Sequence, residues 1–133
     1  VAEDIAERSQ SLVIADTLEY LKKGGRLSQS QYVLGSMLRV KPILGIGDEP
    51  PYVTIATRVR TLKKALETMV NMASEQKLEW AAIVHGEGLE SAQAVQSLLQ
   101  PHIADVPIYE VTPVLGVHLG PGTVGLHWVP AKE

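Results

Sequence analysis

Residues 62–99 read LKKALETMVNMASEQKLEWAAIVHGEGLESAQAVQSLL, and this stretch predicts a helix, a strand and a second helix in succession. In its first part, apolar side chains recur every three or four residues, which is the spacing of one buried helix face. These side chains are Leu62, Ala65, Leu66, Met69, Val70 and Ala73. Residues 80–85 then form an apolar run suited to a buried strand, and residues 89–99 return to helical spacing. The inward positions of this second helix are Ala92, Val95 and Leu99.

The rest of the chain continues the alternation of strands and helices. Strands are predicted over residues 11–15, 40–46, 52–59, 103–111, 113–118 and 124–129. Pro42 favours an edge or the start of its strand, because proline cannot donate to a ladder. Helices are predicted over residues 17–23 and from Ser28 onward, each opened by a capping box. This alternation predicts an α/β fold, a two-layer domain with a mixed β-sheet packed by about four helices.

The composition excludes several classes of function. A formal net charge of −3 argues against a nucleic-acid partner, which needs a basic surface. The chain has no cysteine, which excludes disulfides and thiolate metal sites, and no histidine has a ligand partner at metal-binding spacing. Residues 111–131 carry no charge, but their prolines and glycines would break a spanning helix, so we expect strands and no integral membrane segment.

One candidate site surrounds Arg26. Gly24 and Gly25 precede this arginine, and a helix is predicted to begin at Ser28. Backbone N–H groups and one guanidinium gathered in this way suit an anion such as a carboxylate or a phosphate. The same glycines are also typical of an ordinary helix end, so both interpretations stay open.

A second candidate site surrounds His118, which stands beside a Gly120-Pro121-Gly122 turn. The glycines let the backbone approach a ligand closely, and the imidazole can donate a hydrogen bond to a carboxylate. A hairpin loop beside a structural histidine is the alternative.

Arg60 is a third candidate, because it stands just before the helix predicted from residue 62. A guanidinium there can reach a phosphate or an acidic partner, whereas Lys63 and Lys64 are typical of solvated charge on an amphipathic helix. The sequence around His85 favours loop structure at the end of a strand, since nothing nearby pairs with this histidine for catalysis.

In this order, the segments resemble the DegV family of bacterial fatty acid-binding proteins. Four motifs carry the resemblance, which extends over residues 16–129. They are TLEYLKKGGRLS at residues 17–28, KPIL at 41–44, RTLKKAL at 60–66 and GVHLGPG at 116–122. The chain departs from the family pattern at Leu119, where the family often has threonine after the loop histidine.

The resemblance implies that residues 1–133 are a single domain, the C-terminal lipid-binding domain of a cytoplasmic two-domain protein whose own N-terminal domain is not in this chain. Such a protein holds a long-chain fatty acid in an apolar tunnel and presents it to an ATP-binding fatty acid kinase subunit, without a cofactor or catalysis of its own. His118, Arg26, Gly120 and Gly122 would then bind the lipid carboxylate, and Arg60 would contact the head group or the kinase partner.

Two other functions stay open on the residues alone. The chain could be an enzyme that acts on a small phosphorylated or carboxylated substrate, with His118 as acid or base and Arg26 as the anion clamp. It could also be a structural or protein-interaction domain in which every glycine motif serves as a turn.

Overall fold

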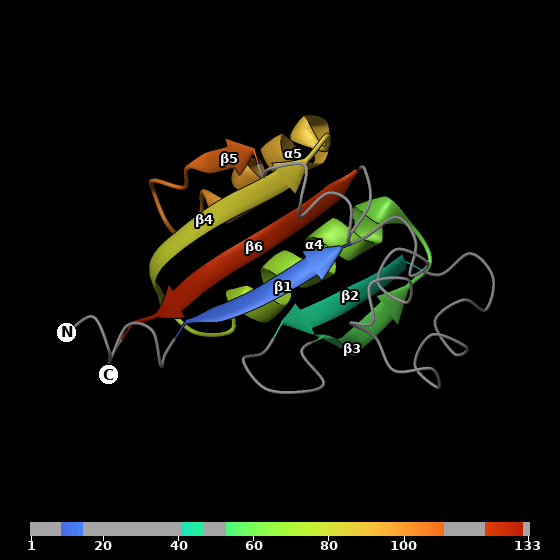
Figure 1. The fold of residues 1–133 in the computed structure, drawn as a ribbon. Coiled ribbons are helices and arrows are strands. Elements are labelled where there is room, and N and C mark those ends of the chain that lie inside the picture. The colour runs from blue at the N-terminus through green and yellow to red at the C-terminus, as the bar shows by residue number, and fades with distance from the viewer. Residues whose placement is uncertain (1–8, 15–40, 47–52, 111–121, 132–133) are drawn as a thin grey trace.

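A computed structural model describes residues 9–14, 41–46, 53–110 and 122–131, and these form one six-stranded sheet and two helices (Figure 1). In chain order the elements are β1 (Gln10–Ile14), β2 (Lys41–Ile46), β3 (Val53–Val59), α4 (Leu62–Ala73), β4 (Leu78–Gly86), α5 (Leu89–Leu99), β5 (Ile108–Glu110) and β6 (Thr123–Pro130). The α/β class is therefore confirmed. The helices predicted at residues 17–23 and from Ser28, and the strand predicted at 113–118, lie outside the described residues.

The sheet is mixed, as predicted, and its strand order is β3-β2-β1-β6-β4-β5. Every neighbouring pair is antiparallel except β4 and β5, which run parallel and are joined through α5. The last strand, β6, lies in the middle of the sheet between β1 and β4. The two halves of the sheet are therefore joined by a strand from near the C-terminal end of the chain.

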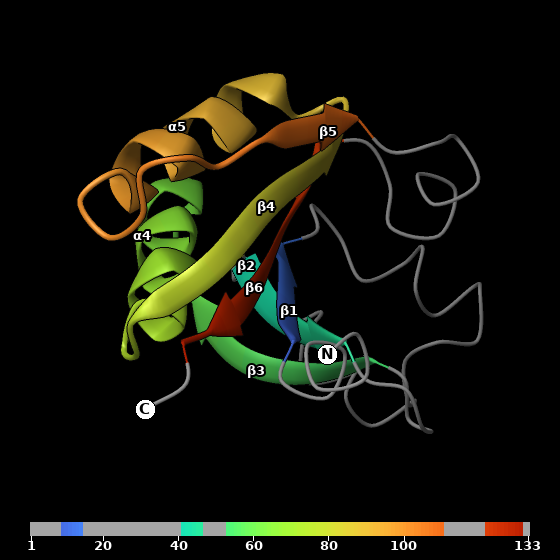
Figure 2. The ribbon, with the colours of Figure 1, turned by 90° about the vertical axis from the view of Figure 1, so that its left-hand side faces the viewer.

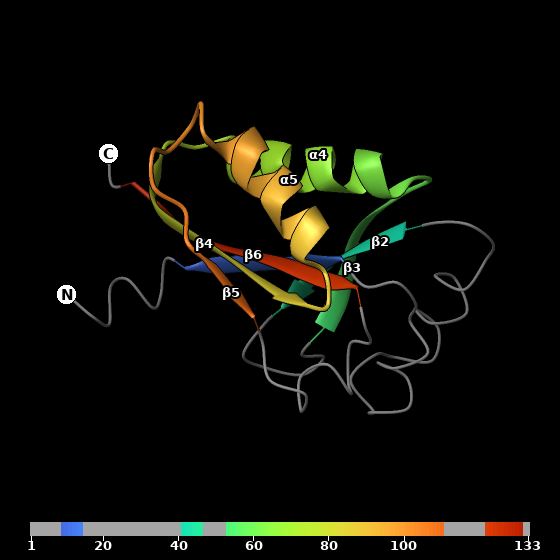
Figure 3. The same cartoon turned by 90° about the horizontal axis from the view of Figure 1, so that it is seen from above.

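Both described helices cover the same face of the sheet, which makes two layers (Figures 2 and 3). The apolar stripes of α4 and α5 pack there against alternate residues of the strands, such as Leu12, Ile83 and Leu126. Met69 of α4 and Val95 of α5 are fully buried in this layer. Removing this much aliphatic surface from water is the main driving force for folding.

For the two described helices, the predicted buried positions are confirmed except at one. Ala65, Leu66, Met69, Val70 and Ala73 are buried in α4, and Ala92, Val95 and Leu99 are buried in α5. Leu62, expected on the buried face, is exposed instead. It is the first residue of α4, where the helix has only just begun, and the N-cap Thr61 accepts a hydrogen bond from the backbone N–H of Lys64.

One strand prediction needs correction, and of the two alternatives for Pro42 the strand start is confirmed. Residues 103–107 are not a strand, because the backbone N–H of Ile103 bonds back to Leu99 at the end of α5, and β5 is only three residues long. Pro42 does not lie on an edge strand, since β2 pairs with both β1 and β3. It does lie at the strand start, as the second residue of β2, where it is paired with Arg58 of β3.

The uncharged C-terminal region was expected to contain strands, and its described part, β6, is a strand. Within the described ranges, no helix has both the length and the apolar character needed to cross a membrane.

Candidate functional site

Six strand termini meet at one end of the sheet, where β6 begins. We call this the Gly122 end, after the residue that precedes β6. The pairing registers place there the last residues of four strands and the first residues of two, namely Ile14, Val59, Gly86, Glu110, Lys41 and Thr123. In Figure 1 this is the end toward which the arrows of β1, β3 and β4 point.

All three candidate sites from the sequence are attached to this end. Arg26, His118 and Gly120 lie outside the described residues, so their side chains and contacts are not described. The chain segments that contain them are nevertheless anchored here, because residues 15–40 connect the end of β1 to the start of β2, and residues 111–121 connect the end of β5 to the start of β6. Arg60 follows the last residue of β3. The topology thus brings to one end of the sheet the strand ends from which these segments leave and to which they return.

Gly122 is the member of the Gly-Pro-Gly turn that the structure describes. Its φ of 82° lies in the left-handed region that favours glycine, which confirms that the turn needs a glycine at this position. Its backbone N–H donates a 2.8 Å hydrogen bond to the carbonyl oxygen of Gly86, at the end of β4. Because of this bond, the end of the turn is held against the β4–α5 connection.

The end of β4 and the two residues that connect it to α5, Glu87 and Gly88, form a tight turn that supports Gly122. The His85 side chain is buried, and its Nδ1 accepts a 3.1 Å hydrogen bond from the backbone N–H of Gly88. Glu87 lies between them at a φ of 56°, a conformation that few side chains adopt. His85, near the end of β4, therefore has a structural role in supporting the turn that follows it, which agrees with the structural interpretation of the sequence.

A glycine is favoured at position 88 by a close approach of two backbones. An added Cβ at Gly88 would lie 3.0 Å from the carbonyl oxygen of Thr123 and 3.3 Å from the carbonyl carbon and oxygen of Gly122. The sequence interpretation missed this contact. The glycine just before the α5 helix was the available signal, but its partner lies more than thirty residues away in the chain.

The two sides of the Gly122 end carry side chains of opposite charge. Both helices begin there, so the partial positive charges of their N-termini lie at the same end. The β3–α4 side presents four exposed cations, Arg58, Arg60, Lys63 and Lys64, whereas the α5–β5 side presents the exposed carboxylates Glu87, Glu90 and Glu110. An anionic group is therefore favoured on the β3–α4 side.

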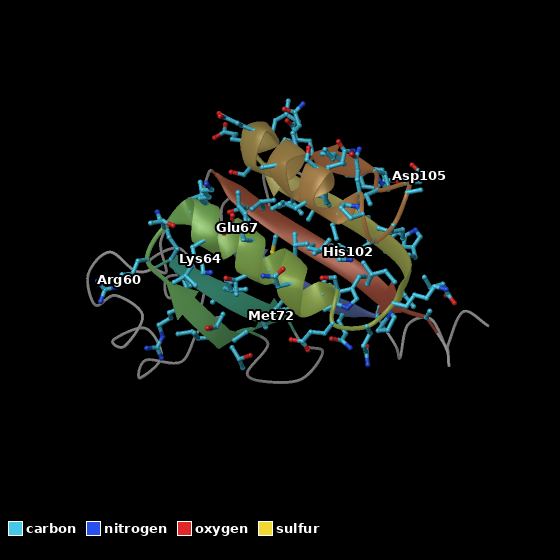
Figure 4. All side chains as sticks on the ribbon, turned by 180° about the vertical axis from the view of Figure 1, so that it is seen from behind. Arg60, Lys64, Glu67, Met72, His102 and Asp105 are labelled. Atoms are coloured by element: carbon cyan, nitrogen blue, oxygen red, sulfur yellow. The ribbon has the colours of Figure 1, made fainter. Side chains whose placement is uncertain are left out.

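Arg60 lies on the cationic side and projects from the start of α4 (Figure 4). Strand β3, which precedes it, is three positions from β6 in the sheet. At a spacing of about 4.8 Å between neighbouring strands, this separation is roughly 14 Å. Arg60 and Gly122 therefore share an end of the sheet, but they are too far apart to bind one carboxylate together.

The described histidines do not form a metal site, and within the described ranges no group of three or more histidine, aspartate or glutamate side chains is arranged to hold an ion. His127 of β6 instead forms a hydrogen bond with Ser11 of β1, with 2.5 Å between Oγ and Nδ1. Burial lowers the pKa of His127 below its ordinary value of 6.5, because the charged imidazolium loses solvation. No sequence signal predicted this pair, since its members are 116 residues apart.

Comparison with known proteins identifies the family. The model of the family described as "Uncharacterised protein, DegV family" matches residues 1–131. This chain belongs to the DegV family. A DegV domain-containing protein of Halalkalibacterium halodurans is 33% identical over 98% of this chain. The match covers 47% of that protein, so this DegV chain spans about half the length of the curated relatives it matches.

Solved DegV structures have the same fold. The crystal structure of a fatty acid-binding DegV family protein from Streptococcus agalactiae superposes with a TM-score of 0.83 at 28% identity, covering 98% of this chain and 47% of that one. The Streptococcus pneumoniae fatty acid kinase B3 protein, loaded with linoleic acid, superposes with a TM-score of 0.85 at 14% identity, covering 97% of this chain and 47% of that one. The second likeness shows the fold alone.

Proposed function

We propose that this chain is the C-terminal lipid-binding domain of a cytoplasmic DegV protein that binds a long-chain fatty acid and has no catalytic activity of its own. The observation that carries the proposal is the superposition of nearly the whole chain on the fatty acid-binding protein of Streptococcus agalactiae, at 28% identity and within the same family. Because the chain spans about half of its relatives, the proposal includes an N-terminal domain that completes the ligand site.

The carboxylate is proposed to bind at the Gly122 end, and the acyl chain to enter an apolar tunnel of this domain. Burial contributes about 0.8 kcal/mol per methylene, whereas an unpaired carboxylate would oppose binding. Donors are therefore needed at the mouth of the tunnel, and we assign them to His118, Arg26 and Gly120, whose segments are continuous in sequence with strand ends at the Gly122 end. The hydrogen bond to Gly86 holds Gly122 in place but uses the N–H of Gly122, so the donors to the carboxylate are assigned to the other residues.

The cationic side of the Gly122 end is proposed to contact an ATP-binding fatty acid kinase subunit, which would phosphorylate the presented carboxylate. Arg60 is exposed and lies roughly 14 Å from strand β6, which favours a contact with a partner over a contact with the carboxylate at Gly122. Its neighbours Lys63 and Lys64 are also exposed, so an acidic partner surface would meet several cations.

The first experiment is mass spectrometry of an organic extract of the protein, purified under native conditions from its complete reading frame. A fatty acid present at one per molecule supports the proposal. Protein that contains no fatty acid, and that also takes up none when it is added, refutes it. The same measurement on residues 1–133 shows whether this domain holds the lipid alone.

Two variants then separate the carboxylate contact from the partner contact. His118→Ala is expected to weaken fatty acid affinity, and His102→Ala is the control, because His102 is exposed near the opposite end of the sheet. Arg60→Ala is expected to lower phosphorylation by the kinase subunit more than it lowers fatty acid affinity. Lys77→Ala is the matched control, since Lys77 is an exposed cation between α4 and β4 at the opposite end. The reverse pattern for either variant contradicts its assigned role.

A further inference from the structure

The last two residues of β4 hold the two residues that flank the segment 111–121. This segment follows Glu110, the last residue of β5, and precedes Gly122 in the chain. Glu110 is the register partner of His85 in the parallel pairing of β4 with β5. Gly122 donates a 2.8 Å hydrogen bond from its backbone N–H to the carbonyl oxygen of Gly86. Both residues that flank the segment are therefore attached to the end of β4.

The imidazole of His85 closes the turn between β4 and α5. Its side chain is only 5% exposed, and its Nδ1 accepts a 3.1 Å hydrogen bond from the backbone N–H of Gly88. Because an N–H group needs an acceptor, the lone pair of the neutral imidazole is on Nδ1 and its proton is on Nε2. The same turn brings Gly88 against the backbone of Thr123, where an added Cβ would lie 3.0 Å from the carbonyl oxygen. The hydrogen bond of His85 therefore helps to hold the end of β4 beside the start of β6.

Protonation of His85 is incompatible with this hydrogen bond. An imidazolium carries a proton on both ring nitrogens and has no acceptor, so its Nδ1–H would face the N–H of Gly88. The two N–H groups would have to separate, and the part-buried N–H of Gly88 would lose its acceptor. Histidine is the side chain that ordinarily changes its charge between about pH 5 and pH 8. Acid in that range therefore opposes the closed form of the turn.

The charged groups around His85 do not remove this incompatibility. Among the described residues they are Glu110, its register partner on β5, and Glu87 and Glu90 at the start of α5, whereas its partner on β6 is the apolar Val124. All three carboxylates are exposed, so solvent and salt screen their attraction for an imidazolium. They attract it whether the turn is closed or open. Only the closed turn places a protonated Nδ1 against a backbone N–H.

We propose that His85 is a positioning residue for the fatty acid site, and that its protonation lowers the affinity for fatty acid on acidification. The inference rests on the proposed function and adds a form of regulation to that same site. The proposed carboxylate donors His118 and Gly120 belong to the segment 111–121, whose flanking residues the closed turn holds in place. Ligand binding therefore favours the unprotonated imidazole, and by linkage a proton on Nδ1 disfavours the ligand.

The test measures the dissociation constant of palmitate at about pH 7.5 and about pH 5.5, on the protein from its complete reading frame. His85→Asn places an amide oxygen near the position of Nδ1, where it can accept from Gly88 but does not titrate. One net hydrogen bond corresponds to a factor of about 3 to 10, so acidification should weaken binding by that much more in the wild-type protein than in His85→Asn. The pH dependence of palmitate itself is common to both proteins. His102→Asn, the same change at an exposed histidine, should behave as the wild-type protein does.

A second variant and one spectrum test the hydrogen bond itself. His85→Leu removes the acceptor at every pH, so it should bind palmitate about 3- to 10-fold more weakly than the wild-type protein at about pH 7.5. Its loss of affinity on acidification should be as small as that of His85→Asn. Nitrogen–proton NMR spectra of the wild-type histidine rings need no substitution, and they should show the proton of neutral His85 on Nε2.

Two results would overturn the inference and leave the proposed function standing. One is a loss of palmitate affinity on acidification that is as large in His85→Asn as in the wild-type protein. The other is a neutral His85 with its proton on Nδ1, which decides the matter even if the variants fail to fold. If palmitate does not bind the wild-type protein at either pH, the proposed function is also wrong.

Discussion

The close backbone approach at Gly88 gives a sharp test of how the β4–α5 turn supports Gly122. The φ of Gly88 is −131°, which any residue can adopt, so Gly88→Ala introduces no backbone strain of its own. The added methyl group would instead lie 3.0 Å from the carbonyl oxygen of Thr123. Both groups that the methyl group would contact are backbone, so the close contact can be relieved only if the start of β6 or the β4–α5 turn moves.

The expected cost combines three effects. Overpacking a tight contact costs about 1–3 kcal/mol. Alanine is also a poorer N-cap than glycine for α5, by roughly 0.5–1 kcal/mol. The reduced entropy of the unfolded chain stabilises the folded protein by about 0.4–1 kcal/mol. The last two effects nearly offset each other, so the free energy of unfolding should fall by about 1–3 kcal/mol.

The assay is urea-induced unfolding of the wild-type protein, Gly88→Ala and a control, Gly45→Ala. The control makes the same substitution in strand β2, where the nearest atom to an added Cβ is Thr54 Oγ1 at 3.4 Å, an ordinary contact. It should change stability by less than about 1 kcal/mol. Equal effects of the two substitutions would refute the argument that backbone contact at Gly88 holds the turn. Under the proposed function, Gly88→Ala should also weaken fatty acid binding more than Gly45→Ala does.

Two further predictions concern the sheet and its core. Because burial lowers the pKa of His127, the unfolded chain takes up a proton before the folded chain does as the pH falls. The contribution of His127 to stability is therefore complete above about pH 6.5 and declines below it until the folded-state pKa is passed. Urea unfolding at about pH 7.5 and about pH 5.5 should show that the free energy of unfolding falls less on acidification in His127→Leu than in the wild-type protein. An equal fall in both proteins would contradict this prediction. Met69→Ala should cost about 2–5 kcal/mol, because Met69 is fully buried, whereas Leu98→Ala should cost under about 1 kcal/mol on the exposed side of α5. Similar costs in calorimetry or urea unfolding would mean that the assigned core is wrong.

Local patterns were sufficient to predict the two described helices and most of the described strands. The buried stripe of α4 depends on side chains three and four residues apart, and these lie on one face in any α-helix. The prediction was wrong at Leu62, the first residue of α4, which is exposed. Periodicity does not show whether the first turn of a helix still packs against the sheet. It was wrong at residues 103–107, because the same apolar residues can close a helix end as well as enter a strand.

The sequence by itself determined most of the described helices and strands, and it indicated the family through four short motifs, since both depend on neighbouring residues. Only the tertiary structure decided the strand order, because β1 and β6 pair across more than a hundred residues. That pairing brings the ends of β1, β3, β4 and β5 to one end of the sheet, together with the start of β6. It also places His127 beside Ser11 and Gly88 against Thr123. Such contacts leave no local pattern in the sequence, because each depends on the register of strands that are distant along the chain.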